Sequence, residues 1–202
     1  MKKVLVTGGS GMLGKDILAE FNSDPKYQMY SVDLKNNQYI DSTQQFVGDL
    51  MDPDFTLSVI NKVKPDIIIH CAAIVNLQSC EENKPLANGI HVGLTKQLAS
   101  YQSGKTKFIY ISTDSVFDGK KGNYNEEDEP TPLNYYAKSK YKGEIACIEN
   151  NKNHMIIRTN IFGFNQPLKN SLAEWAIDSF QQQKPISGFT DIVFNAIYTK
   201  HL

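Results

Sequence analysis

Cysteine is scarce in this 202-residue chain, which has three cysteines and no C-x-x-C pair. Because Cys71, Cys80 and Cys147 leave an odd thiol, the sequence predicts no disulfide framework, and we expect all three to be reduced. The four histidines show no ligand spacing with one another or with the cysteines. The sequence therefore predicts neither a disulfide-stapled domain nor a metal site.

The chain also has neither an excess of charge of one sign nor a long apolar run. The 21 basic and 22 acidic residues nearly cancel, and the basic residues are scattered among the acids, which argues against a nucleic-acid partner. No apolar run is long enough to span a bilayer, and the N-terminus lacks a signal-peptide pattern, so we expect a cytoplasmic protein without a membrane partner. Hydrophobic residues make up 41% of the chain, which is enough for one substantial core.

What the chain does have is a glycine-rich turn near its N-terminus. Gly8, Gly11 and Gly14 lie where the apolar run 4–7 changes to a helical pattern. Gly8 permits a sharp turn, Gly11 leaves room for a pyrophosphate, and Gly14 permits close packing of the helix on the strand. Unpaired backbone N–H groups at the helix N-terminus favour an anion. The pattern predicts a dinucleotide site, with a purely steric turn as the alternative.

A second apolar run, residues 29–33, ends in an acid about 20 residues beyond the glycines, where a carboxylate can bind the adenosine ribose. The charge of Asp33 would also repel a 2′-phosphate, which favours NAD over NADP. Lys35 lies close enough to weaken that preference. The alternative for Asp33 is a solvated acid at a strand end.

Short β-rich runs alternate with helical patterns along the rest of the chain. Further strands are predicted over residues 46–49, 66–71, 107–111 and 154–158, and helices over residues 52–62, 85–100, 134–149 and 171–182. This alternation predicts a doubly wound parallel sheet with right-handed crossovers, a Rossmann-type α/β fold.

Ligands of such sheets bind at the carboxyl ends of the strands, where Ser112 and Thr113 follow the strand predicted over 107–111. Tyr136 and Lys140 share one face of the next long helix at i and i+4. A phenol has an ordinary pKa near 10, and we expect the neighbouring ammonium and a nicotinamide cation to lower it. Tyr136 would then donate a proton while Thr113 binds a substrate carbonyl. The alternative is an exposed helix pair.

Tyr101 and Lys105 match the same Tyr-x-x-x-Lys spacing. We interpret this match as a chance match without a catalytic role, because Gly104 stands where a helix ends and no hydroxyl-bearing strand end precedes it. Tyr135 is a rival phenol, but it lacks a lysine four residues later.

Longer stretches of the chain resemble the extended short-chain dehydrogenase/reductase family of nucleotide-sugar enzymes, and most closely its dTDP-4-dehydrorhamnose reductase branch. The stretches that carry the resemblance are residues 7–14 (TGGSGMLG), 48–50 (GDL), 72–73 (AA), 112–119 (STDSVFDG), 132–140 (PLNYYAKSK) and 158–159 (RT). Residues 112–119 and 132–140 are the most specific to that branch.

The resemblance implies a role for each matching residue. The catalytic residues would be Thr113, Tyr136 and Lys140. The cofactor would contact Gly8, Ser10, Gly11, Met12, Leu13, Gly14, Asp33, Asp49, Leu50, Cys71, Ala72, Ala73, Ser112, Tyr136, Lys140 and Thr159. The substrate would contact Thr113, Ser115, Val116 and Asn160.

The resemblance also implies an activity: reduction of a nucleotide-linked 4-keto sugar by NAD(P)H, in the synthesis of cell-surface polysaccharide precursors. Dehydratases of the family carry a second carboxylate where Ser115 follows Asp114, so simple reduction is favoured. An epimerase or another oxidoreductase of the family, and a non-catalytic NAD(P)-binding regulatory subunit, remain alternatives.

The implied domains are residues 1–159, which bind the cofactor and carry the catalytic residues, and residues 160–202, a partial substrate-binding lobe in a chain that we expect to be truncated. A homodimer is compatible with the resemblance. His91, where relatives commonly have asparagine, and Cys71 depart from the family pattern without removing a catalytic group.

Overall fold

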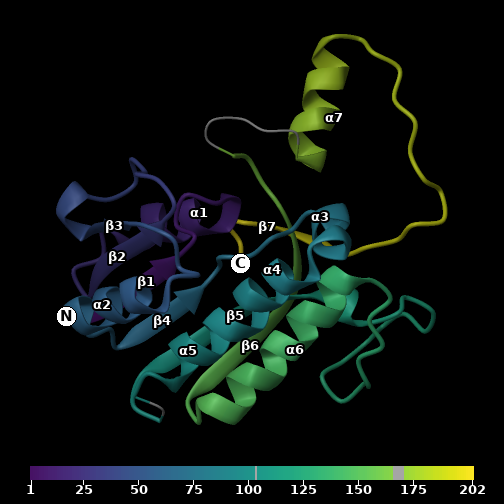
Figure 1. The fold of residues 1–202 in the computed structure, drawn as a ribbon. Coiled ribbons are helices and arrows are strands. Elements are labelled where there is room, and N and C mark those ends of the chain that lie inside the picture. Colours follow the sequence, from purple (N-terminus) through teal and green to yellow (C-terminus); the bar gives the residue numbers. More distant parts are fainter. Residues whose placement is uncertain (103, 166–170) are drawn as a thin grey trace.

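The computed structural model describes residues 1–102, 104–165 and 171–202. Within these ranges a single parallel sheet has the strand order β3-β2-β1-β4-β5-β6-β7 (Figure 1). The strands are β1 (Lys2–Thr7), β2 (Tyr27–Asp33), β3 (Gln45–Val47), β4 (Ile67–His70), β5 (Lys107–Thr113), β6 (His154–Phe162) and β7 (Ala196–Tyr198). The order reverses between β1 and β4, so the sheet is doubly wound and the predicted Rossmann-type fold is confirmed.

The helices agree with the predicted pattern except for α3, which was not predicted. They are α1 (Met12–Phe21), α2 (Pro53–Val63), α3 (Leu77–Glu82), α4 (Lys84–Asn88), α5 (Leu94–Ser100), α6 (Tyr135–Asn150) and α7 (Leu172–Gln181). The helix predicted over residues 85–100 is confirmed as one continuous helical segment, Lys84–Ser100, in which a π-helical turn, Gly89–Gly93, lies between α4 and α5. The α6 helix begins where the Asn134 side chain accepts a hydrogen bond from the N–H of Ala137.

Apolar side chains cover both faces of the sheet. On one face, Ile68 and Phe108 pack with residues of α2, α5 and α6 in one buried cluster. On the other face, Val4, Val6 and Met29 pack with Leu18 of α1. Strands β1 and β4 are therefore buried on both faces, as their unbroken apolar runs predict.

The segment after β6 returns to the sheet at its edge. The α7 helix has a capping box between Ser171 and Glu174, and β7 then pairs in parallel with β6. In Figure 1, α7 lies apart from the sheet and the chain returns to it by a long connection. Thr199, which follows β7, donates a hydrogen bond of 2.5 Å to the buried carboxylate of Asp16 in α1. Among the described helices, none combines the length and the apolar character needed to cross a membrane.

Candidate active site

The glycine-rich turn joins β1 to α1 at the point where the strand order reverses. Gly8 has a φ of +71°, and a side chain there would also meet the backbone of Ala72 at 3.0 Å. A Cβ on Gly14 would overlap the carbonyl oxygen of Gly8 and approach Gly9 Cα at 2.7 Å. The first turn of α1 starts at Gly11 without a side-chain cap, so its N–H groups are available to an anion. These features fit the diphosphate of a dinucleotide.

Asp33 lies at the end of β2 directly beside this turn. Its carboxylate accepts a hydrogen bond of 2.8 Å from the backbone N–H of Ser10 and further bonds from the side chains of Ser31 and Asn37. Asp33 is buried, so the alternative of a solvated strand-end acid is wrong. The carboxylate braces the glycine-rich turn from within the protein, a contact that sequence reasoning did not foresee.

The remaining residues assigned to the cofactor lie at the same edge of the sheet. Asp49 and Leu50 follow β3, and residues 71–73 follow β4. Thr7, the last residue of β1, bonds His70 at 2.7 Å and accepts the N–H of Ala72 at 3.2 Å, which ties the ends of β1 and β4 together. Burial raises the pKa of the Cys71 thiol to about 12, so this cysteine is protonated at neutral pH.

The predicted catalytic residues converge beside the ends of β4 and β5. Thr113 is the last residue of β5, and its side chain lies near enough to the phenol of Tyr136, in the first turn of α6, to act on the pKa of that phenol. One turn later, Lys140 donates a hydrogen bond of 2.6 Å from Nζ to the carbonyl oxygen of Ile111, and its ammonium lies 4.1 Å from the centre of the Tyr110 ring. The structure thus brings Thr113, Tyr136 and Lys140 together, and the alternative of an exposed helix pair is wrong, because Lys140 is buried.

The pKa of the Tyr136 phenol is raised, whereas the sequence predicts that it is lowered. Burial raises the pKa of Tyr136; the side chain of Thr113 opposes this rise and the charge of Asp114 adds to it. The prediction of a lowered phenol pKa is therefore wrong for the groups of the chain itself, because removing a phenolate from water outweighs the opposing effect of Thr113. Burial also lowers the pKa of Lys140 to about 7, against the opposing effects of Cys71 and Glu144.

Glu144, one further turn along α6, is a buried acid that sequence reasoning missed. It accepts a hydrogen bond of 2.5 Å from Ser112 and pairs with Arg158 at 2.7 Å. Arg158 in turn lies 5.1 Å from the ring centre of Phe117. The spacing of Glu144 four residues after Lys140 is a signal that could have placed it on the same buried face. This network fixes α6 against β5 and β6.

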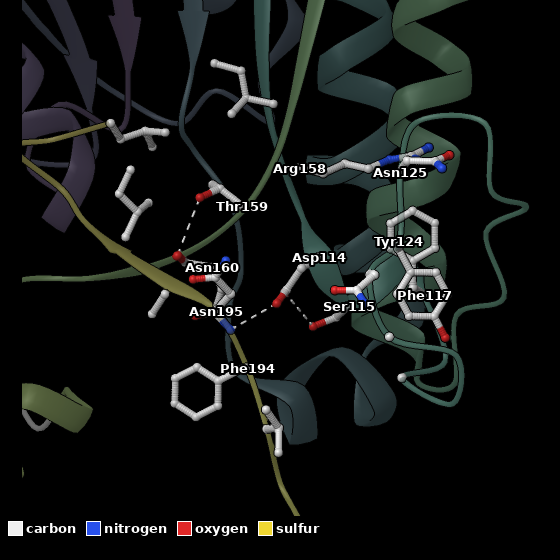
Figure 2. Close-up of a pocket in the computed structure, with 18 of the residues that line it drawn as sticks. Asp114, Ser115, Phe117, Tyr124, Asn125, Arg158, Thr159, Asn160, Phe194 and Asn195 are labelled. Carbon is white, nitrogen blue, oxygen red and sulfur yellow. Dashed lines mark hydrogen bonds between the residues drawn. The ribbon is translucent and has the colours of Figure 1, made fainter.

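An open groove of about 2350 Å³ is lined by Asp114 and Ser115, which directly follow Thr113 in the chain, although Thr113, Tyr136 and Lys140 do not themselves line it (Figure 2). Asp114, Ser115 and Asn160 line it, and Asn160 donates a hydrogen bond of 3.3 Å to Asp114. Phe194 and Asn195 approach these residues from the segment before β7. Of the residues assigned to the substrate, Ser115 and Asn160 line the groove, Thr113 lies at the end of β5, and Val116 is fully buried. The assignment of Val116 to the substrate stays a prediction.

Met12 lines a second, smaller cavity of about 280 Å³ together with Asn160 and Phe162, between the start of α1 and the end of β6. Leu13 is buried. Thr159 of β6 pairs with Thr113 of β5, and Thr159 lines the larger groove.

In the part of the chain that the structure describes, no three His, Cys, Asp or Glu side chains gather as a metal site would require. The second Tyr-x-x-x-Lys match is not helical, since α5 ends at Ser100; its Ser103 lies outside the described residues.

This chain is similar to several curated proteins and solved structures. The chain is 32% identical to methionine adenosyltransferase 2 subunit beta of Rattus norvegicus over 89% of this chain and 53% of that protein. It is 27% identical to the probable low-salt glycan biosynthesis reductase Agl14 of Haloferax volcanii over 92% of this chain and 63% of that protein. The chain therefore spans between about half and two thirds of the length of these relatives.

A solved dTDP-4-dehydrorhamnose reductase of Bacillus anthracis, in complex with NADP, is similar in structure with a TM-score of 0.84 and 29% identity. The match covers 98% of this chain and 66% of that one. The family model described as the RmlD substrate binding domain matches residues 1–193. The chain belongs to the RmlD substrate binding domain family, within the extended short-chain dehydrogenases/reductases.

Proposed function

We propose that this chain takes part in the NAD(P)H-dependent reduction of a nucleotide-linked 4-keto sugar, as dTDP-4-dehydrorhamnose reductases do. The observation that carries the proposal is the convergence of Thr113, Tyr136 and Lys140 at the sheet edge that also carries the glycine-rich turn, next to Asp114 and Ser115, which line an open groove. The likeness to the Bacillus anthracis reductase supports it. We further propose a cytoplasmic location, a role in cell-surface polysaccharide precursor synthesis, and a homodimer.

The chain's own groups suit the proposed chemistry. The N–H groups of the glycine-rich turn would hold the cofactor diphosphate, and a bound reduced nicotinamide would supply the hydride. Thr113 would donate a hydrogen bond to the substrate carbonyl oxygen, and Tyr136 would give its proton to the alkoxide that forms. The raised pKa of Tyr136 keeps this phenol protonated at neutral pH, as a proton donor requires. Lys140, with a pKa of about 7, would hold a further proton at Nζ.

Simple reduction is favoured over dehydration because Asp114 is followed by Ser115 and not by a second carboxylate. For the cofactor we propose NAD(P)H with a preference for NADH, since the buried Asp33 beside the turn would repel a 2′-phosphate. The NADP complex of the Bacillus anthracis relative makes NADPH the competing choice. Titration with NADH and NADPH, followed by nicotinamide fluorescence, decides between them; a chain that binds neither contradicts the proposal.

A second candidate function is that of a non-catalytic, NAD(P)-binding regulatory subunit. The 32% identity to methionine adenosyltransferase 2 subunit beta favours it, because that title names a subunit of another enzyme and not a reductase. An epimerase remains a third candidate, on the basis of the family. Both alternatives predict cofactor binding without net consumption of NAD(P)H on a 4-keto sugar.

The test is turnover of a dTDP-4-keto sugar, followed by loss of absorbance of the reduced cofactor. We expect Tyr136→Phe to lower kcat by roughly a hundredfold or more, since it removes the proton donor. Tyr135→Phe is the matched control: its hydroxyl accepts a hydrogen bond of 2.7 Å from Asn88 outside the catalytic trio, so kcat should change less than about threefold. Equal turnover by Tyr136→Phe and the unaltered chain would show that the proton-donor assignment is wrong.

A further inference from the structure

The π-helical turn between α4 and α5 places a histidine against the first turn of α6. The turn spans Gly89–Gly93, and His91 within it is 1% exposed. Single π-helical turns occur frequently at functional sites. The approach to α6 is close, because a Cβ on Gly143 of α6 would overlap both the His91 carbonyl oxygen and the Tyr110 hydroxyl. This packing makes the imidazole of His91 part of the wall around the catalytic residues.

Both ring nitrogens of His91 have partners, and these partners belong to different parts of the site. The Nε2 atom accepts a hydrogen bond of 3.1 Å from the N–H of Ile74, in the segment that follows β4. The Nδ1 atom lies 2.8 Å from the hydroxyl of Ser139, and Ser139 donates a bond of 2.8 Å to the carbonyl oxygen of Tyr136. The imidazole ring also contacts the Tyr136 ring edge to face, with centroids 5.8 Å apart.

These bonds define the state of the ring. A backbone N–H can only donate, so Nε2 carries no proton and Nδ1 carries the single proton of the neutral imidazole. Nδ1–H therefore donates to Ser139, whose own hydroxyl proton goes to Tyr136. Burial and the charge of Lys140 lower the pKa of His91 to about 3, which agrees with a neutral ring. One imidazole thus connects the end of β4 to the backbone of Tyr136 in a fixed direction.

We propose that His91 is a positioning residue, which fixes the Tyr136 phenol relative to the end of β4 through Ser139 on one side and Ile74 on the other. The inference rests on the proposed function, because Tyr136 is the proton donor in that proposal and the segment after β4 lines the cofactor. The carbonyl oxygen of His91 is engaged separately by Thr95 at 2.7 Å, so the ring and the backbone of this residue can be tested independently.

The first experiment separates the two ring contacts by substitution. In His91→Asn the amide nitrogen takes the place of Nδ1 and retains the bond to Ser139, whereas in His91→Gln the amide oxygen takes the place of Nε2 and retains only the bond from Ile74. We expect His91→Gln to lower kcat by roughly tenfold to a hundredfold, the effect of a catalytic group displaced by about 1 Å, with the Kd for reduced cofactor changed less than about threefold. His91→Asn should retain most of kcat.

Ser139→Ala supplies the other half of the comparison. It should lower kcat alone, add nothing in the His91→Gln background, and remove the advantage of His91→Asn. Thr95→Val is the matched control, since it removes a buried hydrogen bond to His91 but to its carbonyl oxygen only, and kcat should stay within about twofold. Full kcat in His91→Gln, or additive losses in the double variant, overturns the proposal.

The second experiment needs no turnover, so it also holds if the proposed function fails. In 15N-histidine NMR of the unaltered chain, we expect His91 as the neutral Nδ1–H tautomer that does not titrate between pH 5 and pH 9. In 13C-tyrosine NMR, with the Tyr136 signal assigned through Tyr136→Phe, the signal should shift in His91→Gln and Ser139→Ala and stay in place in Thr95→Val. An Nε2–H tautomer, or a Tyr136 signal indifferent to all three changes, overturns the positioning role. Wild-type inactivity with the expected spectra contradicts only the proposed function.

Discussion

The region around β4, β5 and α6 differs sharply from the segment that contains α7 and the connection to β7. In the first region charged and polar side chains are buried and paired, as Glu144 and Lys140 are at 1% and 2% exposure. In the second region large apolar side chains face solvent, with Phe180 at 73%, Phe189 at 82% and Val193 at 94% exposure. The site chemistry therefore rests on the region in which polar and charged groups are buried and paired, while the second region exposes large apolar side chains to solvent.

The largest effect that tests this contrast comes from adding one methyl group to Gly14, in the closely packed start of α1 beside the first region, and one to Gly188 in the second region. Gly14→Ala would press a Cβ against the backbone of Gly8 and Gly9, and we expect it to lower the free energy of unfolding by roughly 4 kcal/mol and to abolish cofactor binding. Gly188→Ala, where a Cβ would meet nothing within 4 Å, should change neither. Urea denaturation and cofactor titration measure both. Comparable losses in the two variants would remove the contrast.

A smaller effect is expected from neutralising a buried acid in each region. Glu144→Gln leaves Arg158 without its anionic partner and should lower the global free energy of unfolding by about 3 kcal/mol. Glu174→Gln weakens the capping box of α7 and should cost about 1 kcal/mol, confined to that helix. Hydrogen exchange of α6 and α7 amides distinguishes global from local loss. If Glu174→Gln also exposed α6 amides, the two regions would unfold as one unit.

The smallest effect is a pH dependence confined to α7. Burial raises the pKa of Glu174, but hydrogen bonds from Ser171 and Asn165 outweigh it and hold this pKa at about 2, below the ordinary 4.5. Because the pKa is lowered in the folded state, the stabilisation is complete above about pH 4.5 and is lost as the pH falls toward 2. We expect protection factors of α7 amides to fall between pH 5 and pH 3, and to change little in Glu174→Gln. A fall of the same size in that variant would assign the dependence to another group.

Much of the fold could be predicted from the sequence because its signals are local. The glycine-rich turn, the buried strand β4 and the Asn134 cap of α6 each depend on a few neighbouring residues. The helix over residues 85–100 could be predicted, but its π-helical turn at Gly89–Gly93 could not, because the sequence carries an ordinary helical pattern there and the turn packs closely against Gly143, which is distant in sequence.

The catalytic residues could be predicted as a set, but their electrostatics could not. Spacing places Tyr136 and Lys140 on one helix face, yet the direction of the Lys140 side chain is decided by the carbonyl oxygen of Ile111, which is distant in sequence. The burial that raises the pKa of Tyr136 is likewise a property of the assembled site. The roles of Glu144 and His91 were missed for the same reason, since each is defined by partners on other elements.

The hydrogen bond between Thr199 and Asp16 joins residues that are 183 positions apart. Asp16 belongs to the helix that starts at the glycine-rich turn, and Thr199 directly follows the last strand. The residue that follows β7 is thereby bonded to α1 through a single carboxylate. We therefore expect a displacement of β7 to move, through this hydrogen bond, the helix whose first N–H groups would hold the cofactor diphosphate in the proposed function.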